Sequence, residues 1–310
     1  MKLVSVCMIT YNHEDFIAQA IDSALIQKTS FDYEIVIGED NSSDRTGEIC
    51  KAYHENYPEK IKLRSHNENI GMMPNFINTL KSCTSKYIAL LEGDDFWTDP
   101  EKLQKQVDFL EAHPEYAICF TNSNLLYEDD PSKQSLFIKK KLKSTLALSD
   151  ILKGNFIPTQ SCVFRNQHFQ DYPGWFYNAL PGDWFLHIFN AHFGLLKYMD
   201  EVMSTYRIHK GGVYSGEPKI SNFEKTISSL NSYYEEVEIK YRGIIRRNLS
   251  KRYFSIGKLL LKANRKKEAL NRTLMSIKVY PLNLIHVPFH YLKFFFLLIL
   301  PLNLRKSSHN

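Results

Sequence analysis

The stretch Lys86-Tyr-Ile-Ala-Leu-Leu-Glu-Gly-Asp-Asp-Phe-Trp97 is a run of apolar, strand-forming residues that ends in three acids. Residues 87–91 predict a buried strand. Glu92, Asp94 and Asp95 then lie beyond the carboxyl end of that strand, where open α/β sheets bind their ligands. Because adjacent carboxylates repel one another and are costly to desolvate, we expect a cation among them.

Two interpretations of this acidic loop are possible. Oxygen ligands suit the hard divalent cations Mg²⁺ and Mn²⁺, so the loop is a candidate site for a cation that bridges a diphosphate. The alternative is a solvated acidic turn between a strand and a helix. The loop alone does not distinguish them.

The composition is that of an ordinary globular protein. The 310 residues are enough for one large α/β domain and an appendage. With 44% hydrophobic and 24% charged residues, the chain is neither disordered nor fibrous. The five cysteines are odd in number and form no Cys-x-x-Cys pair, which indicates reduced thiols of an intracellular protein. The N-terminus leads directly into a predicted strand, with no signal-peptide pattern.

Charge is distributed unevenly. Residues 223–310 contain 17 of the 39 Lys and Arg but 5 of the 34 Asp and Glu, a net charge of +12, whereas residues 1–222 carry −7. A basic tail on an acidic body predicts contact with an anionic surface. Membrane lipid is the first candidate, and nucleic acid is disfavoured because no nucleic-acid-binding motif is present. The alternative is that the basic residues form a solvent-exposed helical face that binds no partner.

Apolar strands alternate with helical patterns over the first part of the chain. This spacing predicts βαβ units and a mostly parallel, doubly wound sheet. The acidic loops 39–44 and 92–95 each follow a strand, so both lie at the binding edge of the sheet. Asn12 is the expected cap of the first helix. The expected strands are 3–10, 33–38, 60–65, 87–91 and 116–121, and the expected helices follow residues 12, 44, 75 and 99.

The rest of the chain is less regular. Residues 128–143 are polar and lysine-rich, which is typical of a loop or hairpin. After residue 160, short strands, a helix containing Trp184 and Ile188, and a strand at 203–209 are expected. The domains assigned are 1–222, with a nucleotide-binding half 1–122 and an acceptor half 123–222, and a basic helical tail 223–310.

Five short motifs occur in order along this chain: Ser5-Val-Cys-Met-Ile-Thr-Tyr-Asn12, Ile35-Val-Ile-Gly-Glu-Asp-Asn-Ser-Ser-Asp-Arg-Thr46, Asn69-Ile-Gly71, Ala89-Leu-Leu-Glu-Gly-Asp-Asp-Phe-Trp97 and Gly182-Asp183. In order and spacing they resemble the family 2 glycosyltransferases, especially bacterial members that build capsule, lipopolysaccharide or related glycans. The resemblance covers about residues 1–215. It implies a GT-A fold and an inverting transfer of a sugar from a nucleotide-diphosphate donor, a UDP-sugar first, to a glycan hydroxyl.

The resemblance implies a nucleoside pocket at the first two motifs. Thr10 and Tyr11 would line it, with Tyr11 against the base, and Asp40 would hydrogen-bond the edge of uracil or a comparable base. Tyr11 could otherwise be a half-exposed aromatic at a strand end. Glu39 and Asp44 are expected to support the loop and cap the next helix.

In the fourth motif, glutamate replaces the first acid of the family's Asp-x-Asp signature. The resemblance implies that Glu92 reaches the ribose and that Asp94 ligates Mn²⁺ or Mg²⁺, which would neutralise the departing diphosphate. Asp95 would contact the donor or its metal through water, or only hold the loop. Arg207 is assigned to the donor diphosphate and His209 to the metal.

Asp183 is the candidate general base, because the family carries such an acid there to deprotonate the acceptor hydroxyl. The alternative is a plain helix cap. Two departures from the family weaken the match. Gly182 stands where relatives carry glutamate, and Pro74-Asn75 occupies a region where many relatives carry an arginine near the phosphates.

The tail combines a basic helical run with an apolar end. The uninterrupted apolar stretch Phe294–Leu300 is too short to span a bilayer. An in-plane helix over 284–304, flanked by Arg305 and Lys306, predicts a cytoplasmic protein bound peripherally to the inner face of the cell membrane. The alternative is a terminal helix that packs on the body or in a dimer.

Two other functions stay open. A sugar-phosphate nucleotidyltransferase shares the architecture but needs a glycine-rich loop after the first strand, and residues 10–14 contain no glycine. A non-catalytic protein that binds sugar nucleotides is compatible with the acids. Gly182, which stands where relatives carry glutamate, is also compatible with this alternative. It predicts nucleotide and metal binding without turnover.

Overall fold

The structure is a computed structural model that describes residues 2–130, 132–167, 171–212 and 216–299. The chain divides into two compact units. Unit 1 comprises residues 1–151 and 155–216, and unit 2 comprises 152–154 and 217–310. The division after Gly216 lies close to the boundary at residue 222 that was expected from charge.

The first half of the sheet in unit 1 is parallel. The strands β1 (Val4–Thr10), β2 (Tyr33–Glu39), β3 (Ile61–Ser65) and β4 (Tyr87–Leu90) lie in the order β3-β2-β1-β4. They are the first four strands predicted from apolar runs. Because β1 lies between β2 and β4, the loops that follow these three strands meet at one edge of the sheet.

The second half of this ten-stranded sheet is mixed. The long strands β6 (Tyr116–Tyr127) and β10 (Leu195–Ile208) pair in parallel, but β9 (Val163–Arg165) lies antiparallel between β4 and β6. The strand β5 (Phe96–Trp97) pairs antiparallel with β10. Strands of two or three residues carry no readable periodicity, which explains why the sequence predicted a more parallel sheet. Two further short strands pair with β6 and β10, namely β7 (Gln134–Leu136) and β8 (Thr145–Leu146).

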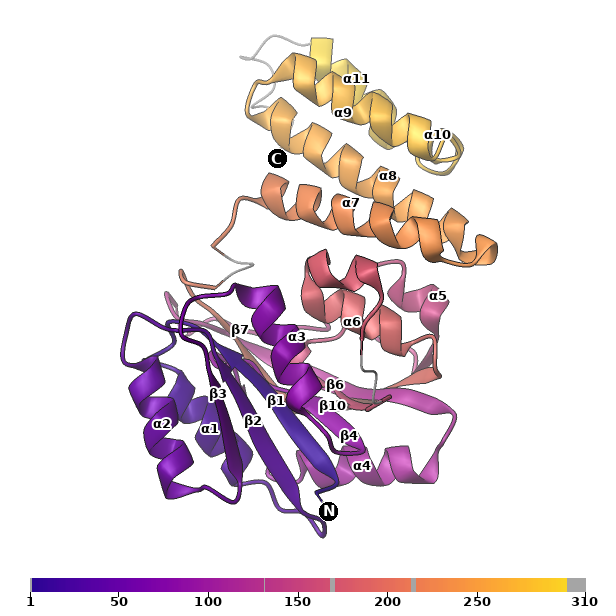
Figure 1. The fold of residues 1–310 in the computed structure, drawn as a ribbon. Helices are drawn as coiled ribbons and strands as arrows, with labels where there is room; N and C mark the ends of the chain where they lie inside the picture. The colour runs from indigo at the N-terminus through magenta and orange to yellow at the C-terminus, as the bar shows by residue number, and fades with distance from the viewer. Residues whose placement is uncertain (1, 131, 168–170, 213–215, 300–310) are drawn as a thin grey trace. The chain divides into compact units, whose positions relative to one another are not determined.

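Helices cover this sheet. The helix α3 (Met72–Ser82) lies over β1 and β2 (Figure 1). The helix α1 begins only at Ile17, and Asn12 adopts a left-handed backbone with φ 54°, so the expected cap at Asn12 is wrong. The short side chain of asparagine tolerates that conformation. The remaining helices of unit 1 are α1 (Ile17–Leu25), α2 (Thr46–Asn56), α4 (Lys102–Ala112), α5 (Leu148–Ile151) and α6 (Gly182–Asn190), with 3-10 turns at Thr159–Ser161 and Gly174–Asn178.

The helix α6 carries a fully buried histidine, His187. Neither ring nitrogen of His187 has a hydrogen-bond partner among the residues that the structure describes. Burial without a partner disfavours the charged imidazolium. The pKa of His187 is therefore lowered from 6.5 to about 3 by desolvation.

We expect this histidine to make unit 1 less stable in acid. Below pH 6.5 His187 is protonated in the unfolded chain, whereas in the folded chain it stays neutral down to about pH 3. The free energy of unfolding therefore falls as the pH falls. The loss is about 2 kcal/mol between pH 7 and pH 5. Denaturant titrations followed by tryptophan fluorescence measure it, because all three tryptophans lie in unit 1.

The substitution His187→Leu should remove this contribution, so the free energy of unfolding should fall by about 2 kcal/mol less between pH 7 and pH 5 than in the wild type. The matched control is His286→Gln, which changes an exposed histidine of unit 2. An identical pH dependence in wild type and His187→Leu would contradict the expectation.

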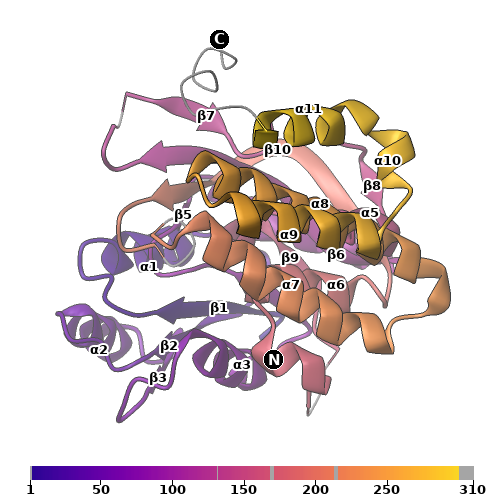
Figure 2. The ribbon, with the colours of Figure 1, turned by 90° about the horizontal axis from the view of Figure 1, so that it is seen from above.

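Unit 2 is an array of helices. Figure 2 shows α8 and α9 side by side, and their contact is close because a Cβ on Gly257 of α8 would meet Oγ1 of Thr273 at 2.5 Å. The hydroxyls of Ser250 and Ser276 lie 2.9 Å apart between the same two helices. The helices are α7 (Lys219–Glu236), α8 (Ile239–Lys262), α9 (Lys266–Val279), α10 (Asn283–His286) and α11 (Pro288–Ile299).

Among the helices in the described part of the chain, none is both long and apolar enough to cross a bilayer.

Candidate active site

The acidic loop after β4 runs directly beside the end of β1. The N–H of Gly93 donates to the carbonyl of Ile9 at 3.0 Å. A Cβ on Gly93 would lie 2.5 Å from Oγ1 of Thr10 and 3.0 Å from Nδ1 of His13. Such contacts leave no space for a side chain. The glycine thereby lets the backbone of the acidic loop lie against the N-terminal loop.

The three acids of this loop form one cluster. One carboxylate oxygen each of Glu92, Asp94 and Asp95 lies within 4.8 Å of the others. Burial, together with the neighbouring negative charges, raises the pKa of Glu92 and of Asp95 well above the usual range. One oxygen of Asp95 accepts the N–H of Arg207 at 2.8 Å, and the other is buried with no partner among the described residues. A divalent cation would satisfy this orphaned oxygen and the surplus negative charge.

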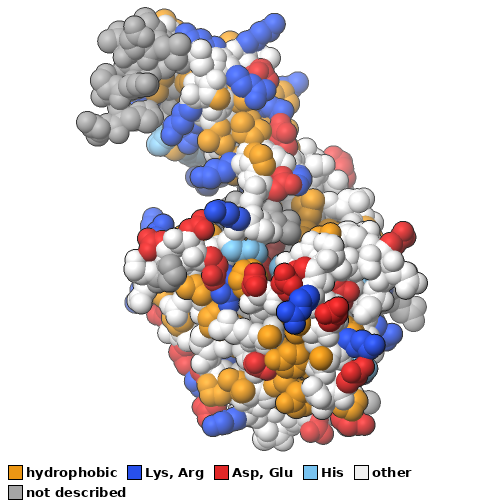
Figure 3. Space-filling model, turned by 90° about the vertical axis from the view of Figure 1, so that its left-hand side faces the viewer, with side chains coloured by type: hydrophobic (Ala, Val, Ile, Leu, Met, Phe, Trp, Pro, Cys, Tyr) orange, Lys and Arg blue, Asp and Glu red, His pale blue; other side chains and the backbone are white. Residues whose placement is uncertain are grey.

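Two histidines complete the cluster. Nε2 of His209 lies 3.0 Å from Oδ2 of Asp94, and Nε2 of His13 lies 3.8 Å from the same oxygen. Burial alone would raise the pKa of Asp94, but the hydrogen bond from His209 and the charges of both histidines hold this pKa below its usual value. Figure 3 shows histidine side chains (pale blue) beside acidic ones on one face of unit 1. The donor set of nitrogen and oxygen atoms therefore suits a divalent metal ion.

Sequence reasoning assigned Asp94 and His209 to the metal but missed His13. Only its place directly after the Thr10-Tyr-Asn12 segment could have suggested it, because that segment ends β1 at the edge of the sheet. Nothing in the spacing of residues 13, 94 and 209 indicates that they meet.

Arg207 is an anchor of the acidic loop. Its Nε donates to the carbonyl oxygen of Asp94 at 2.8 Å, and its two terminal nitrogens donate to Glu128 and Gln19. The guanidinium also lies 4.6 Å from the ring centre of Phe16, within the range of cation–π attraction. All of these partners belong to the protein, so a contact between Arg207 and the donor diphosphate stays a prediction.

The nucleoside-pocket candidates lie around the ends of β1 and β2. Tyr11 is 42% exposed at the end of β1. Both oxygens of the buried Asp40 accept backbone N–H groups, from Ile70 at 2.9 Å and from Gly71 at 3.0 Å. Asp40 thereby joins the third motif to the second. A contact between Asp40 and a base, or between Tyr11 and a base, stays a prediction.

Glu39 and Asp44 hold the loop between β2 and α2, as expected. Glu39 accepts the N–H of Ser42 at 2.7 Å. Asp44 accepts the N–H of Thr46, the first residue of α2, at 2.9 Å, and that of Glu14 at 3.1 Å. These contacts tie the two N-terminal loops together at the sheet edge.

Asp183 lies in the first turn of α6 with one oxygen held from two directions. Its Oδ2 accepts hydrogen bonds from Nδ2 of Asn155 at 2.9 Å and from the hydroxyl of Thr159 at 3.1 Å. Burial raises the pKa of Asp183, and these hydrogen bonds offset part of the rise. The charge of Asp183 also contributes to the raised pKa of Glu92, so the two acids share one electrostatic neighbourhood. Sequence reasoning did not identify Asn155 and Thr159 as partners of Asp183.

The structure explains the glycine that precedes Asp183. A Cβ on Gly182 would lie 2.5 Å from Sδ of Met73 in α3. The space that a glutamate would enter is therefore taken by Met73. The role of Asp183 as the general base stays a prediction.

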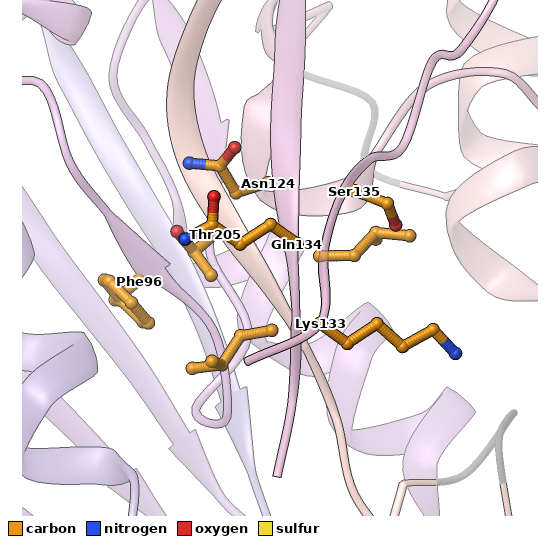
Figure 4. Close-up of a pocket in the computed structure, with 8 residues that line it drawn as sticks. Phe96, Asn124, Lys133, Gln134, Ser135 and Thr205 are labelled. Atoms are coloured by element: carbon orange, nitrogen blue, oxygen red, sulfur yellow. The ribbon is translucent and has the colours of Figure 1, made fainter. Parts of the chain in front are cut away.

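A separate cavity of 260 Å³ lies beside β5 and β10 (Figure 4). Its walls combine the aromatic Phe96 with polar side chains, among them Asn124, Ser135 and Thr205. Its eight lining residues include none of the clustered acids and histidines. The remaining lining residues are Leu125, Leu126, Lys133 and Gln134.

This chain is similar in sequence to known proteins. The uncharacterised protein Rv1520 of Mycobacterium tuberculosis is 38% identical over 212 residues, which are 68% of this chain and 60% of that protein. This chain thus spans about three fifths of that relative's length. WfaP of Escherichia coli, named UDP-Glc:alpha-D-GlcNAc-diphosphoundecaprenol beta-1,3-glucosyltransferase, is 32% identical over 130 residues, 42% of this chain and 49% of WfaP.

A solved structure shows the same fold. The mannosyltransferase PcManGT from Pyrobaculum calidifontis, in complex with GDP-Man and Mn²⁺, aligns with a TM-score of 0.60 at 14% identity, covering 89% of this chain and 74% of that one. The expected GT-A fold with a helical C-terminal extension is confirmed. The profile described as Glycosyl transferase family 2 matches residues 5–173, more than half of the chain. The chain therefore belongs to glycosyltransferase family 2.

Proposed function

We propose that this protein is a metal-dependent, inverting glycosyltransferase. It transfers a sugar from a nucleotide-diphosphate donor, a UDP-sugar first, to a hydroxyl of a surface-polysaccharide or lipid-linked glycan. The observation that carries the proposal is the pairing of two differently built acidic centres. One is the cluster around Asp94, which is suited to a cation, and the other is Asp183, which is held by hydrogen bonds from Asn155 and Thr159.

The cluster around Asp94 supports the donor half of the reaction. Asp94 and His209 would hold Mn²⁺ or Mg²⁺, and Glu92, which has a carboxylate oxygen within 4.8 Å of one of Asp94, would bind the ribose. The bound cation would neutralise the charge that grows on the departing diphosphate. Thr10, Tyr11, Asp40, Asp95 and Arg207 are the further donor-site candidates at this edge of the sheet.

Asp183 supports the acceptor half. Its ionised carboxylate would take the proton of the acceptor hydroxyl while that oxygen forms a bond to the anomeric carbon. The bond from the same carbon to the diphosphate breaks, and the nucleoside diphosphate leaves with its electron pair. A single displacement of this kind inverts the anomeric centre. A carboxylate with a raised pKa is a better base, and Asn155 and Thr159 fix its direction.

The test is nucleotide release from a panel of nucleotide sugars with Mn²⁺, Mg²⁺ or EDTA. We expect slow, metal-dependent hydrolysis of one donor, because water enters an acceptor site that is empty. Where hydrolysis is absent, a membrane extract supplies the acceptor. Tight nucleotide binding with no turnover, even with this extract, would contradict the proposal and favour a non-catalytic sugar-nucleotide-binding protein.

Unit 2 supports a location at an anionic membrane surface on the inner face of the cell membrane. One face of α11 packs inward, where the ring of Tyr291 lies 4.4 Å from that of Phe254 in α8. The opposite face is apolar and exposed, with Phe289 81%, Leu292 64% and Phe296 63% accessible. Exposed apolar patches rimmed by polar groups mark interaction sites.

Unit 2 also carries many exposed basic side chains. Figure 3 shows Lys and Arg (blue) beside hydrophobic side chains (orange) on unit 2. Basic residues combined with an exposed apolar helical face match an interfacial helix on anionic lipid. The exposed basic residues of this unit include Arg246, Arg247, Lys251, Lys258, Lys262, Lys266, Lys267 and Lys293.

Co-sedimentation with vesicles tests this location. We expect the wild type to bind phosphatidylglycerol vesicles, more weakly at high salt, and not pure phosphatidylcholine. Replacing Phe289, Leu292 and Phe296 together with serine should weaken vesicle binding about tenfold or more, because the apolar area that enters the lipid is lost.

The matched control is Leu274→Ser with Met275→Ser on α9, which removes exposed apolar side chains from another helix. Undiminished vesicle binding by the triple-serine variant would contradict the membrane proposal. A change from dimer to monomer in that variant, measured by light scattering, would instead assign the face to a second copy of the chain.

A further inference from the structure

We propose that His13 is a third protein ligand of the metal ion, beside Asp94 and His209, and that it makes the site prefer Mn²⁺ to Mg²⁺. The inference rests on the proposed function, because it concerns the cation that this function requires. Nitrogen atoms of the two histidines and an oxygen of Asp94 all lie within 4.8 Å of one another. One ion can contact atoms at this spacing.

The backbone of His13 is fixed on both sides. Its N–H donates to Oγ1 of Thr46 at 2.7 Å. Its carbonyl oxygen accepts the N–H groups of Phe16 and Ile17, each at 2.9 Å. Because these bonds join the loop after β1 to the start of α1 and of α2, the imidazole projects from a rigid base. Rigid support is what a metal ligand needs.

The imidazole ring is also oriented. Nδ1 of His13 lies 3.2 Å from the hydroxyl oxygen of Thr10, and Gly93 packs against both groups. When Nδ1–H donates to Thr10, the lone pair of the neutral ring is on Nε2, the nitrogen that faces Asp94. Histidines that bind metals usually donate their other ring nitrogen in this way. Thr10 is thus a positioning residue for His13.

The distance to Asp94 favours a shared ion over a direct bond. Nε2 of His13 and Oδ2 of Asp94 are 3.8 Å apart, which exceeds a hydrogen bond. The imidazole of His209 approaches the same oxygen at 3.0 Å. Two imidazoles turned to one carboxylate oxygen form a donor set of two nitrogens and one oxygen.

This donor set has a consequence for metal choice. Imidazole suits transition metals, whereas Mg²⁺ prefers oxygen ligands and retains its water. A site with Asp94 and one histidine would discriminate less between the two ions than a site with two histidines. His13 therefore raises the affinity for Mn²⁺ far more than that for Mg²⁺.

The first test is a titration of the full chain with Mn²⁺, followed by electron paramagnetic resonance, with and without UDP. We expect His13→Gln to weaken Mn²⁺ binding at least about tenfold, while the Mg²⁺ concentration that displaces half of the Mn²⁺ falls. The matched control is His113→Gln, a histidine at the end of α4 that pairs with Glu115. Its Mn²⁺ affinity should equal that of the wild type.

Pulsed resonance of bound Mn²⁺ gives a second readout that does not depend on activity. Two imidazole nitrogens should couple to the ion in wild type and one in His13→Gln. A second variant, His13→Asp, replaces the nitrogen ligand with oxygen and should shift the preference toward Mg²⁺. This gain of Mg²⁺ binding requires a folded site, so it separates a ligand role from a merely structural one.

The outcomes separate this inference from the proposed function. Equal Mn²⁺ affinity and two coupled nitrogens in His13→Gln would overturn the role of His13, while metal-dependent transfer would still stand. If the wild type binds no Mn²⁺ with or without UDP, both the role of His13 and the metal dependence are overturned. Weaker Mn²⁺ binding with one coupled nitrogen supports the inference.

Discussion

Replacing Asp183 with asparagine is expected to lower turnover about 10³-fold while donor binding stays near its wild-type value. Asparagine keeps the size of the side chain and an oxygen that accepts the hydrogen bonds of Asn155 and Thr159. It cannot take a proton from the acceptor hydroxyl. The effect should therefore fall on kcat for transfer, and calorimetric binding of the nucleotide sugar should be unchanged.

The pH profile gives this prediction a second observable. Burial raises the pKa of Asp183, so the carboxyl stays protonated to a higher pH than an exposed aspartate does. Since only the ionised form accepts a proton, kcat should fall as the pH drops through this raised pKa and reach a plateau above it. Residual activity of Asp183→Asn should lack this acidic limb.

A matched substitution is Asp171→Asn, which changes an exposed acid that pairs with Lys81. Its turnover and pH profile should equal those of the wild type. Turnover of Asp183→Asn within a few-fold of the wild type would rule out Asp183 as the base and leave it the role of a helix cap.

Replacing Asp94 with alanine is expected to abolish metal-dependent nucleotide release, a loss of about 10³-fold or more. Two groups of side chains are candidates for holding the cation, and both include Asp94. One group adds the acids Glu92 and Asp95, and the other adds the histidines His13 and His209. Without it, neither group can hold a cation in the arrangement described. The rate of nucleotide release and the affinity for Mn²⁺ should both fall in Asp94→Ala. The Asp183→Asn variant, in contrast, should retain its affinity for Mn²⁺.

The control for this variant is Asp108→Asn, an exposed acid of α4 that accepts a hydrogen bond from Gln104. A thermal melt of each variant verifies that unit 1 is folded. Metal-dependent release at the wild-type rate in a folded Asp94→Ala variant would contradict the assignment of the cation to this cluster.

Much of the parallel half of the sheet was predictable from the sequence. The strands β1, β2 and β4 are apolar runs that end in polar loops, and such runs form wherever a strand is buried on both faces. The loops after parallel strands meet at one edge, so the placement of Asp40 and the acidic loop at the same edge of the sheet follows from their position after β2 and β4. The membership of glycosyltransferase family 2 was likewise readable from motif spacing.

The mixed half of the sheet was not predictable in this way. β5 and β9 contain two and three residues, too few to show a period, and their partners lie far away in sequence. For the same reason the sequence did not reveal that Arg207, at the end of β10, holds the backbone of Asp94. The assignment of its guanidinium to the donor diphosphate stays a prediction.

The sequence by itself determined which residues carry charge and lone pairs, and at which strand ends they occur, because local patterns set secondary structure. Only the tertiary structure decided which of them meet. His13, Asp94 and His209 come from three distant segments, and they converge because β1 lies beside β4 and the acidic loop lies beside the end of β10. The support of Asp183 by Asn155 and Thr159 and the occupation of the space beside Gly182 by Met73 have the same origin. Such contacts depend on the packing of whole elements, and no local pattern encodes them.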